Sequence, residues 1–161
     1  MFQKLFITKL ILCSILVFAF ETKASDWPDI PFKNASGEKL KLSEFEGQVL
    51  VVKFWATWCG YCIQQMPVLS LIEKRYSNNE NVKFLPISID YKGKREVENF
   101  YQEKNIKNLG VYTDQKNILF RSLDLAGVPS ILIISKEGGI VAEYNSIKDL
   151  DLKLIDKLVK S

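Results

Sequence analysis

The sequence predicts an α/β protein in which helices flank a mixed central sheet on both faces. Residues 49–55 are a strongly apolar, β-branched run of the kind that forms a buried central strand, and residues 82–89 are predicted to be a second buried strand. Apolar residues at helical spacing follow each run, which is the order of elements in a sheet covered by helices. Residues 130–134 and 140–144 surround the turn sequence Glu137-Gly138-Gly139, which predicts an antiparallel pair. The sheet is therefore expected to contain strands of both directions.

Residues 1–24 have the order of a secretory signal peptide, which is removed from the mature protein. Lys4 and Lys9 form a basic start, residues 10–20 are an apolar run with Ser14 as its one polar residue, and the small residue Ala24 ends a short polar segment. We therefore predict cleavage after Ala24 and export to the periplasm or another extracytoplasmic space.

Two other interpretations of this leader are a retained membrane anchor and a lipoprotein. A spanning helix needs about 20 apolar residues, and the apolar run has roughly half that length. A lipid-attachment cysteine needs a small residue before it, whereas Leu12 precedes Cys13. Both features favour the cleaved signal peptide, with the N-terminal membrane anchor as the alternative.

Residues 25–161 form the predicted domain. Its length of about 137 residues suits one domain with one core, and neither an internal repeat nor a linker divides it. The whole chain has 22 basic and 19 acidic side chains. Without the leader the net charge is about +1, which is too balanced to indicate nucleic acid or anionic lipid as a partner. We expect the mature protein to be a monomer.

The other elements of this domain follow in order along the chain. Prolines impose an extended segment up to residue 31, and residues 39–42 alternate like a strand. A short strand is expected over 109–112, and Asp114 is of the residue type that caps a further short helix. Longer helices are expected at three places where apolar residues recur at helical spacing: 60–76, 95–104 and 149–160.

The mature protein has two cysteines, Cys59 and Cys62, separated by two residues. Exported proteins that use disulfides as staples spread their cysteines to close long loops. A bridge between these two closes a loop of about four residues, which contributes roughly 2 kcal/mol in the chain-entropy description. A pair this close is better suited to being opened and closed than to holding a fold together.

The cysteine pair joins a buried strand to the start of a helix. Residues three apart on a helix are one turn from each other, close enough for a disulfide. Free N–H groups and the macrodipole at a helix N-terminus stabilise a thiolate, and cysteine pKa values there fall to roughly 3.5–7.5. We therefore predict that Cys59 attacks a partner's disulfide and that Cys62, more buried one turn further on, resolves the mixed disulfide.

Other uses of a closely spaced cysteine pair need residues that the chain lacks. A zinc site takes four ligands from cysteine, histidine or carboxylate, and the chain has no histidine and no second mature cysteine pair. A cysteine protease needs a general base beside its thiol, and no histidine is present to supply one. These absences favour redox chemistry without a metal.

Several motifs in order resemble the thioredoxin superfamily, and within it the exported TlpA-like and ResA-like branch. The resemblance covers residues 32–143. It depends on short sequence elements and an inserted strand–helix segment: Leu-Ser-Glu-Phe-Glu-Gly-Gln at 42–48, Phe-Trp-Ala-Thr-Trp-Cys at 54–59, Pro67, Gly127-Val128-Pro129 and the insertion over 87–104. The resemblance implies a thioredoxin fold with the N-terminal extension and central strand–helix insertion of that branch.

By this resemblance, residues around the cysteines bind the partner protein. Pro129 is expected to be a cis-proline that faces the site, and Val128 is expected to offer its backbone to the partner peptide. Trp58, Gly60 and Tyr61 are expected to contact the same partner.

Two positions depart from the family pattern. Thioredoxin has a buried acid where this chain has Lys53, and the TlpA-like branch has a glutamate where it has Gln65. Either acid can accept the proton of the resolving cysteine, whereas glutamine cannot. We expect Lys53 to be half buried with its ammonium reaching outward. Lys53 and Gln65 are thus candidates for proton transfer or for tuning the thiols, and the proton acceptor of Cys62 is left open.

The resemblance implies an enzyme that reduces protein disulfides outside the cytoplasm, with no cofactor beyond its redox-active cysteines. Its expected partners are client proteins and a membrane-embedded electron carrier. The alternative is an oxidant or isomerase that forms disulfides with the same cysteines. A copper chaperone on this fold takes a histidine ligand, which the chain lacks. A peroxiredoxin requires proline and threonine where Val52 and Ala56 stand.

Overall fold

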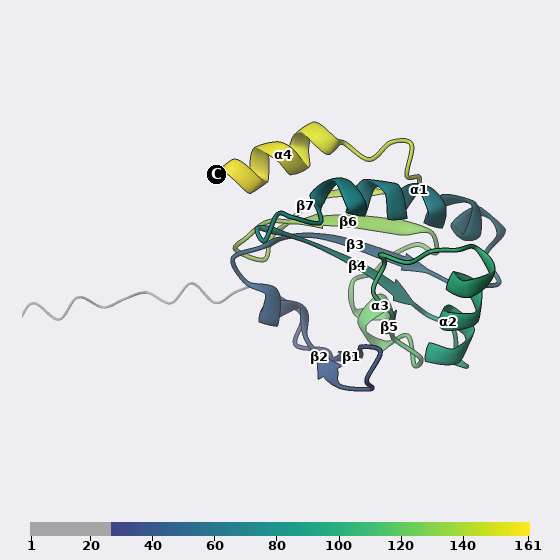
Figure 1. Cartoon of the computed structure of the whole chain (residues 1–161). Helices are drawn as coiled ribbons and strands as arrows, with labels where there is room; N and C mark the ends of the chain where they lie inside the picture. The colour runs from purple at the N-terminus through teal and green to yellow at the C-terminus, as the bar shows by residue number, and fades with distance from the viewer. Residues whose placement is uncertain (1–26) are drawn as a thin grey trace, which may run out of the picture.

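The computed structural model describes residues 27–161 (Figure 1), so the predicted signal peptide over 1–24 lies outside the described residues. The strands form one seven-stranded sheet in the order β2-β1-β5-β4-β3-β6-β7. They are β1 (Phe32–Lys33), β2 (Lys39–Leu40), β3 (Val49–Trp55), β4 (Val82–Ser88), β5 (Tyr112–Thr113), β6 (Ser130–Ile134) and β7 (Ile140–Tyr144). The helices are η1 (Leu42–Phe45), α1 (Gly60–Tyr76), α2 (Lys94–Glu103), α3 (Ile118–Ser122) and α4 (Leu152–Lys160). Within residues 27–161, none of the helices combines the length and hydropathy that a membrane span requires.

The strand β3 forms the centre of the sheet. It runs parallel to β4 and antiparallel to β6, and all of its residues are buried. On the outer sides, β4 pairs parallel with β5 and β6 pairs antiparallel with β7. The mixed sheet predicted from the sequence is confirmed. The crossover through α1 makes β3 and β4 parallel, and the short turn before β7 makes the last pair antiparallel.

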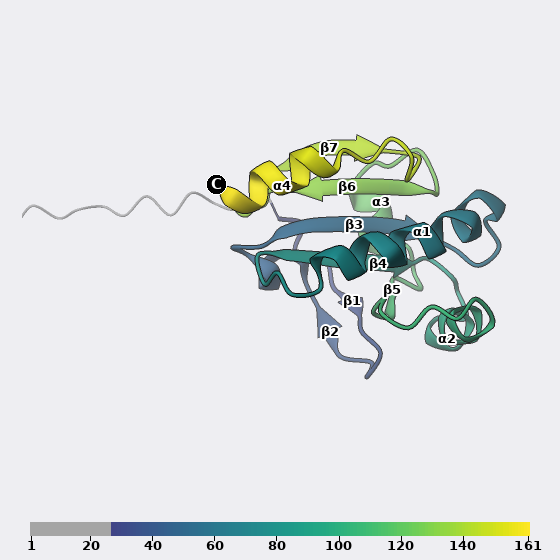
Figure 2. The same cartoon turned by 45° about the horizontal axis from the view of Figure 1, so that its top comes forward.

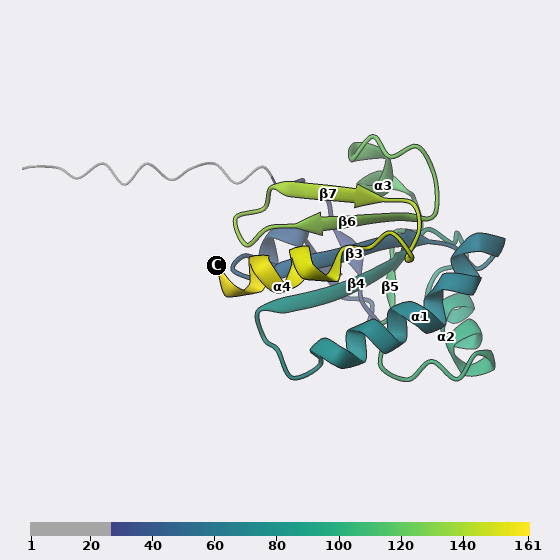
Figure 3. The same ribbon diagram turned by 90° about the horizontal axis from the view of Figure 1, so that it is seen from above.

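Helices cover both faces of the sheet. The helices α1 and α4 lie over one face and α3 lies under the other (Figure 1). The helix α2 lies beside α1 at the end of the sheet where β3 and β4 finish (Figures 2 and 3). There the Trp55 ring stacks on Tyr101 at 5.9 Å between centroids and also packs against Phe100. The inserted helix therefore closes that end of the core.

Neighbouring residues of β3 face opposite layers. The side chain of Lys53 reaches Gln65 on α1, whereas the ring of Phe54 packs edge-on against Phe120 of α3, with 5.4 Å between centroids. This alternation is the two-residue period of a strand. Position 53 consequently points into the layer between the sheet and the helix that begins at the cysteine pair.

Two short strands lie at residues other than those predicted. Phe32–Lys33 forms β1, which the extended proline-rich start did not predict, and its pairing with β2 and β5 adds the N-terminal segment to the sheet. The strand expected over 109–112 is instead β5, Tyr112–Thr113. Its position depends on pairing with Ile87, Ser88 and Lys33 on neighbouring strands, so the local sequence did not determine it.

The start of α3 also differs from the prediction. Asn117, in the left-handed conformation with φ 55°, precedes the helix, so Asp114 is not its N-cap residue. Asp114 nevertheless satisfies the helix start, because its carboxylate accepts hydrogen bonds from the backbone N–H groups of Ile118 at 3.0 Å and Phe120 at 2.9 Å. Asp114 therefore accepts hydrogen bonds from the start of the helix, as expected, but it lies three residues before the N-cap residue Asn117.

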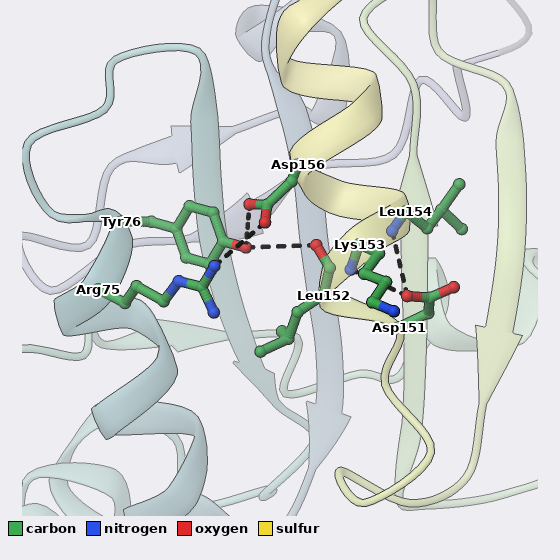
Figure 4. Close-up of polar contacts among 7 residues, drawn as sticks. All are labelled: Arg75, Tyr76, Asp151, Leu152, Lys153, Leu154 and Asp156. Carbon is green, nitrogen blue, oxygen red and sulfur yellow. Dashed lines mark hydrogen bonds and ion pairs between the residues drawn. The ribbon is translucent and has the colours of Figure 1, made fainter.

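Polar contacts attach α4 to the end of α1 (Figure 4). The hydroxyl of Tyr76 donates to the carboxylate of Asp156 at 2.7 Å. Burial and this hydrogen bond raise the pKa of Tyr76 to about 12, so it stays a donor at neutral pH. Asp151 caps α4 by accepting from the backbone N–H groups of Lys153 and Leu154. The helix therefore begins at residue 152 rather than at the predicted 149.

Candidate active site

The cysteine pair lies where β3 passes into α1. Cys59 is the N-cap residue of α1, and Cys62 belongs to the first turn of that helix. The two sulfurs form a disulfide, with the Cα atoms 5.1 Å apart. Cys59 is 8% exposed and Cys62 is completely buried. Of the two, only Cys59 reaches the surface.

The backbone around Cys59 has the polarity that stabilises a negative charge on sulfur. The N–H of Cys62 donates to the Sγ of Cys59 at 3.2 Å. That sulfur also lies at the N-terminus of a 17-residue helix, where unpaired N–H groups and the macrodipole favour an anion. A thiolate on Cys59 would be stabilised by both contributions.

A segment distant in sequence completes the site. The Val128–Pro129 peptide bond is cis, as predicted. The Sγ of Cys59 lies 3.7 Å from the carbonyl oxygen of Val128, which is 69 residues further along the chain. The two segments meet because β6, which begins directly after Pro129, pairs with β3. The sheet pairing therefore brings Val128 and Pro129 to the cysteines.

The surface around the cysteine pair is open and partly aromatic. Trp58 is 64% exposed and Tyr61 is 77% exposed. A Cβ added to Gly60 would meet no atom within 4 Å. On the Tyr61 side, a groove of about 560 Å³ lies between α1 and the loop before α4, and Pro129 and Ile147 are among its lining residues. Tyr61 and Pro129, two of the residues predicted to bind a partner, thus line one groove.

Lys53 and Gln65, the two positions that depart from the family pattern, contact each other. The Nζ of Lys53 donates to the Oε1 of Gln65 at 2.7 Å, and the same oxygen accepts the backbone N–H of Ile147 at 3.2 Å. Lys53 is completely buried, so the expectation that its ammonium reaches outward was wrong. The strands β4 and β6 flank this central position, so the side chain stays in the interior instead of reaching outward. Burial lowers the pKa of Lys53 from 10.5 to about 8.

Asp90 lies two residues after the end of β4. Its side chain fixes the loop that precedes Cys59. Its carboxylate accepts the backbone N–H of Thr57 at 2.9 Å and the Thr57 hydroxyl at 2.8 Å. It also accepts the hydroxyl of Ser88 at 2.7 Å, and Asp90 is only 3% exposed. Sequence reasoning did not single out this residue. Its position in the sequence could have indicated it, because Asp90 follows a buried strand that runs parallel to β3. The carboxyl ends of parallel strands lie at the same edge of a sheet, so an acid there is expected to lie near the cysteines.

Replacing Asp90 with alanine is expected to lower the free energy of unfolding by about 3 kcal/mol, because the N–H and hydroxyl of Thr57 and the hydroxyl of Ser88 lose their acceptor. Urea denaturation with the disulfide intact measures the change. Asp149→Ala, at an exposed position, is the control and should change stability by no more than about 0.5 kcal/mol. Equal stabilities for the two variants would contradict a structural role for Asp90.

The sequence pattern of the family described as Redoxin matches residues 22–154 of this chain. The chain belongs to the Redoxin family. Thioredoxin-like protein YneN of Bacillus subtilis (strain 168) is 30% identical to this Redoxin family member over 118 residues, which are 73% of this chain and 56% of YneN. Thiol-disulfide oxidoreductase ResA of the same strain is 24% identical over 120 residues, 74% of this chain and 65% of ResA. The chain spans less than two thirds of either relative.

Solved structures confirm the thioredoxin fold of this Redoxin family member. The pneumococcal exposed lipoprotein thioredoxin Etrx1 from Streptococcus pneumoniae strain TIGR4 has a TM-score of 0.65 and 25% identity, covering 83% of this chain and 98% of that one. The thioredoxin domain of the Bacteroides vulgatus thiol-disulfide oxidoreductase BVU-2223 has a TM-score of 0.69 and 20% identity, covering 82% and 94%. With the family match, these findings confirm the resemblance to the ResA-like branch and support an oxidoreductase enzyme.

Proposed function

We propose that this protein is a thiol–disulfide oxidoreductase that reduces disulfides of client proteins outside the cytoplasm. The observation that carries the proposal is the position of Cys59, whose sulfur lies at the N-terminus of α1 and 3.7 Å from the carbonyl oxygen of Val128. Cys59 and Cys62 supply the redox chemistry without a further cofactor. We also propose that the protein acts as a monomer.

Reduction of a client begins with attack by the Cys59 thiolate on one sulfur of the client disulfide. A bond forms between Cys59 and that sulfur, and the other client sulfur leaves as a thiolate that takes a proton from water. The Cys62 thiolate then attacks the Sγ of Cys59, and the client's second sulfur leaves in the same way. The products are a reduced client and the Cys59–Cys62 disulfide present in the structure, so two electrons pass to the client.

The open face around the cysteines supports a protein client rather than a small molecule. In the proposal, the backbone of Val128 pairs with the client chain beside its disulfide, and Pro129 keeps that backbone next to Cys59. The exposed rings of Trp58 and Tyr61 supply apolar contact area, which aromatic side chains provide at interfaces. Gly60, which leaves the space above it open, lets the client approach.

The proposed location outside the cytoplasm depends on the basic, apolar and small-residue order of residues 1–24. A related structure, Etrx1 of Streptococcus pneumoniae, is described as an exposed lipoprotein thioredoxin, which supports an exported member of this family. In such a compartment the enzyme must be returned to the dithiol form after each turnover. We therefore propose a membrane-embedded electron carrier as its second partner.

The redox potential of the Cys59–Cys62 pair tests the direction of the reaction. Equilibration of the purified mature protein with defined mixtures of reduced and oxidised glutathione, followed by thiol alkylation and mass measurement, gives this potential. A reductant is expected to lie near the thioredoxin value of about −270 mV, and an oxidant near the DsbA value of about −120 mV. A value close to the latter would overturn the reductant in favour of the disulfide-forming alternative.

A further inference from the structure

Lys53 is a charged side chain in the interior of the protein. It lies in the middle of β3, with Pro86 on β4 and Ile131 on β6 opposite it in the register of the sheet. Its side chain is completely buried. A buried ammonium loses its hydration and needs a compensating partner. Within residues 27–161, no ion pair involves Lys53, and its Nζ has one hydrogen-bond partner, the Oε1 of Gln65 at 2.7 Å.

The contact with Gln65 connects the Lys53 amine to the part of α1 that carries Cys62. Gln65 and Cys62 are three residues apart on α1, and residues with this spacing are neighbours on one side of a helix, with about 5–6 Å between their Cβ atoms. Both Lys53 and Cys62 are fully buried. Through Gln65, the Lys53 amine is therefore connected to the first turns of α1, where Cys62 lies.

Other charged residues of the surrounding segments do not share this interior. Lys148 and Asp149 in the loop before α4, and Lys153 and Lys157 on α4, are exposed. The carboxylate of Asp156 accepts hydrogen bonds from Arg75 and Tyr76. The carboxylate of Glu73 on α1 accepts a hydrogen bond from the side-chain amide of Asn108. Opposite Lys53, β4 and β6 present Pro86 and Ile131, which do not titrate. Within residues 27–161, none of these charged groups forms an ion pair with Lys53.

Burial makes Lys53 able to give up its proton near neutral pH. It lowers the pKa of the amine to about 8, and no charged neighbour contributes to the change. At that pKa about one molecule in ten carries the neutral amine at pH 7. A neutral amine is a base, whereas the amide of Gln65 cannot accept a proton.

Resting on the proposed function, we infer that the neutral amine of Lys53 accepts the proton that Cys62 loses when it resolves the mixed disulfide. The proton moves from the Sγ of Cys62 to the Nζ of Lys53, and the electron pair stays on sulfur. The resulting ammonium stabilises the Cys62 thiolate until it bonds to the Sγ of Cys59. The client sulfur leaves with the electron pair of the broken bond and takes a proton from water, and Lys53 later returns its proton to solvent.

Gln65 has a positioning role in this arrangement. Its Oε1 accepts both the Nζ of Lys53 and the backbone N–H of Ile147, so it connects β3, α1 and the loop before α4. Because the amide carries no charge, it orients the amine without holding it as an ammonium. A carboxylate there would pair with the ammonium and raise the pKa of Lys53.

The first test measures resolution directly. A mixed disulfide between Cys59 and a model thiol is formed at about pH 4, where Cys62 stays protonated, and release of that thiol is followed by stopped flow after a jump to between about pH 6 and 9.5, a window that spans the ordinary thiol pKa. Lys53→Met is expected to slow release by about 10²-fold at pH 7, the size of a typical general-base contribution, and to shift the rise of the rate to higher pH. Lys83→Met, on the adjacent strand β4, is the matched control and should keep the wild-type profile.

The second test does not need turnover. In a Cys59→Ser background, the ¹³Cβ shift of Cys62 is titrated with Lys53, with Lys53→Met and with Lys53→Arg, and Lys53→Gln replaces the methionine variant if that does not fold. Loss of the amine is expected to raise the pKa of the Cys62 thiol. Arginine keeps the charge but cannot act as a base, so it should restore this pKa but not the rate of release.

The outcomes separate the two proposals. If a folded Lys53→Met protein keeps the wild-type rate profile and Cys62 titration, the inference is overturned while the proposed function stands. If arginine restores the rate, Lys53 acts through its charge alone and is not the proton acceptor. If wild-type protein exchanges no disulfides, the proposed function fails, and the Cys62 titration still shows whether Lys53 and Cys62 are coupled.

Discussion

Cys59→Ser is expected to lower the rate of client disulfide reduction by about 10³-fold or more, to the uncatalysed background, because it removes the only thiol of the pair that reaches the surface. A serine hydroxyl at the same helix N-terminus has no ionised form near neutral pH and cannot form the mixed disulfide. Insulin reduction with excess dithiothreitol, followed by turbidity, measures the loss. The fold should be unaffected, since the side chain is only slightly smaller.

Cys62→Ser is the matched comparison for this result. It keeps the attacking thiol but cannot resolve the intermediate, so mixed disulfides with clients should accumulate and be visible on non-reducing gels. The proposed order of attack fails if Cys59→Ser is the variant that traps clients and Cys62→Ser traps none. Such a result would make the buried cysteine the nucleophile, which the observed burial argues against.

The oxidised Lys53→Met variant is expected to be more stable than the wild type by about 3 kcal/mol at pH 7, because the wild type must bury an ammonium that prefers water. Methionine has a similar length and no charge, so it fills the same space without that cost. Urea denaturation of both proteins with the disulfide intact gives the difference in the free energy of unfolding. Lys83→Met, with its partly exposed side chain, serves as the control and should differ from the wild type by about 0.5 kcal/mol or less.

The pH dependence gives this prediction its sign. The pKa of Lys53 is about 8 in the folded protein and 10.5 ordinarily. Between these values the unfolded chain binds a proton that the folded chain does not, so wild-type stability rises with pH. The advantage of Lys53→Met should therefore be full below pH 8 and vanish by about pH 10.5. The raised pKa of Tyr76 affects both proteins alike. A difference that does not change over this range would mean that Lys53 keeps its ordinary pKa.

Local sequence features were sufficient for most of the elements that hold the cysteines. The apolar run of β3 and the helical spacing of α1 predicted both elements with the observed bounds. The positions of β1 and β5 could not be predicted in the same way. Each of these strands has two residues, too few for an alternation pattern, and each exists because a neighbouring strand offers its backbone.

The sequence by itself determined the cysteine spacing, the helix start at Cys59 and the motif around Pro129, because each is a property of a few consecutive residues. Only the tertiary structure decided that Lys53 is buried and hydrogen-bonded to Gln65, which lies 12 residues further along the chain. It also decided that Asp90 holds Thr57, 33 residues away. These contacts depend on which strands are neighbours and which helix covers them. Burial and proton affinity depend on the same packing, so the pKa of Lys53 follows from the fold and not from its local sequence.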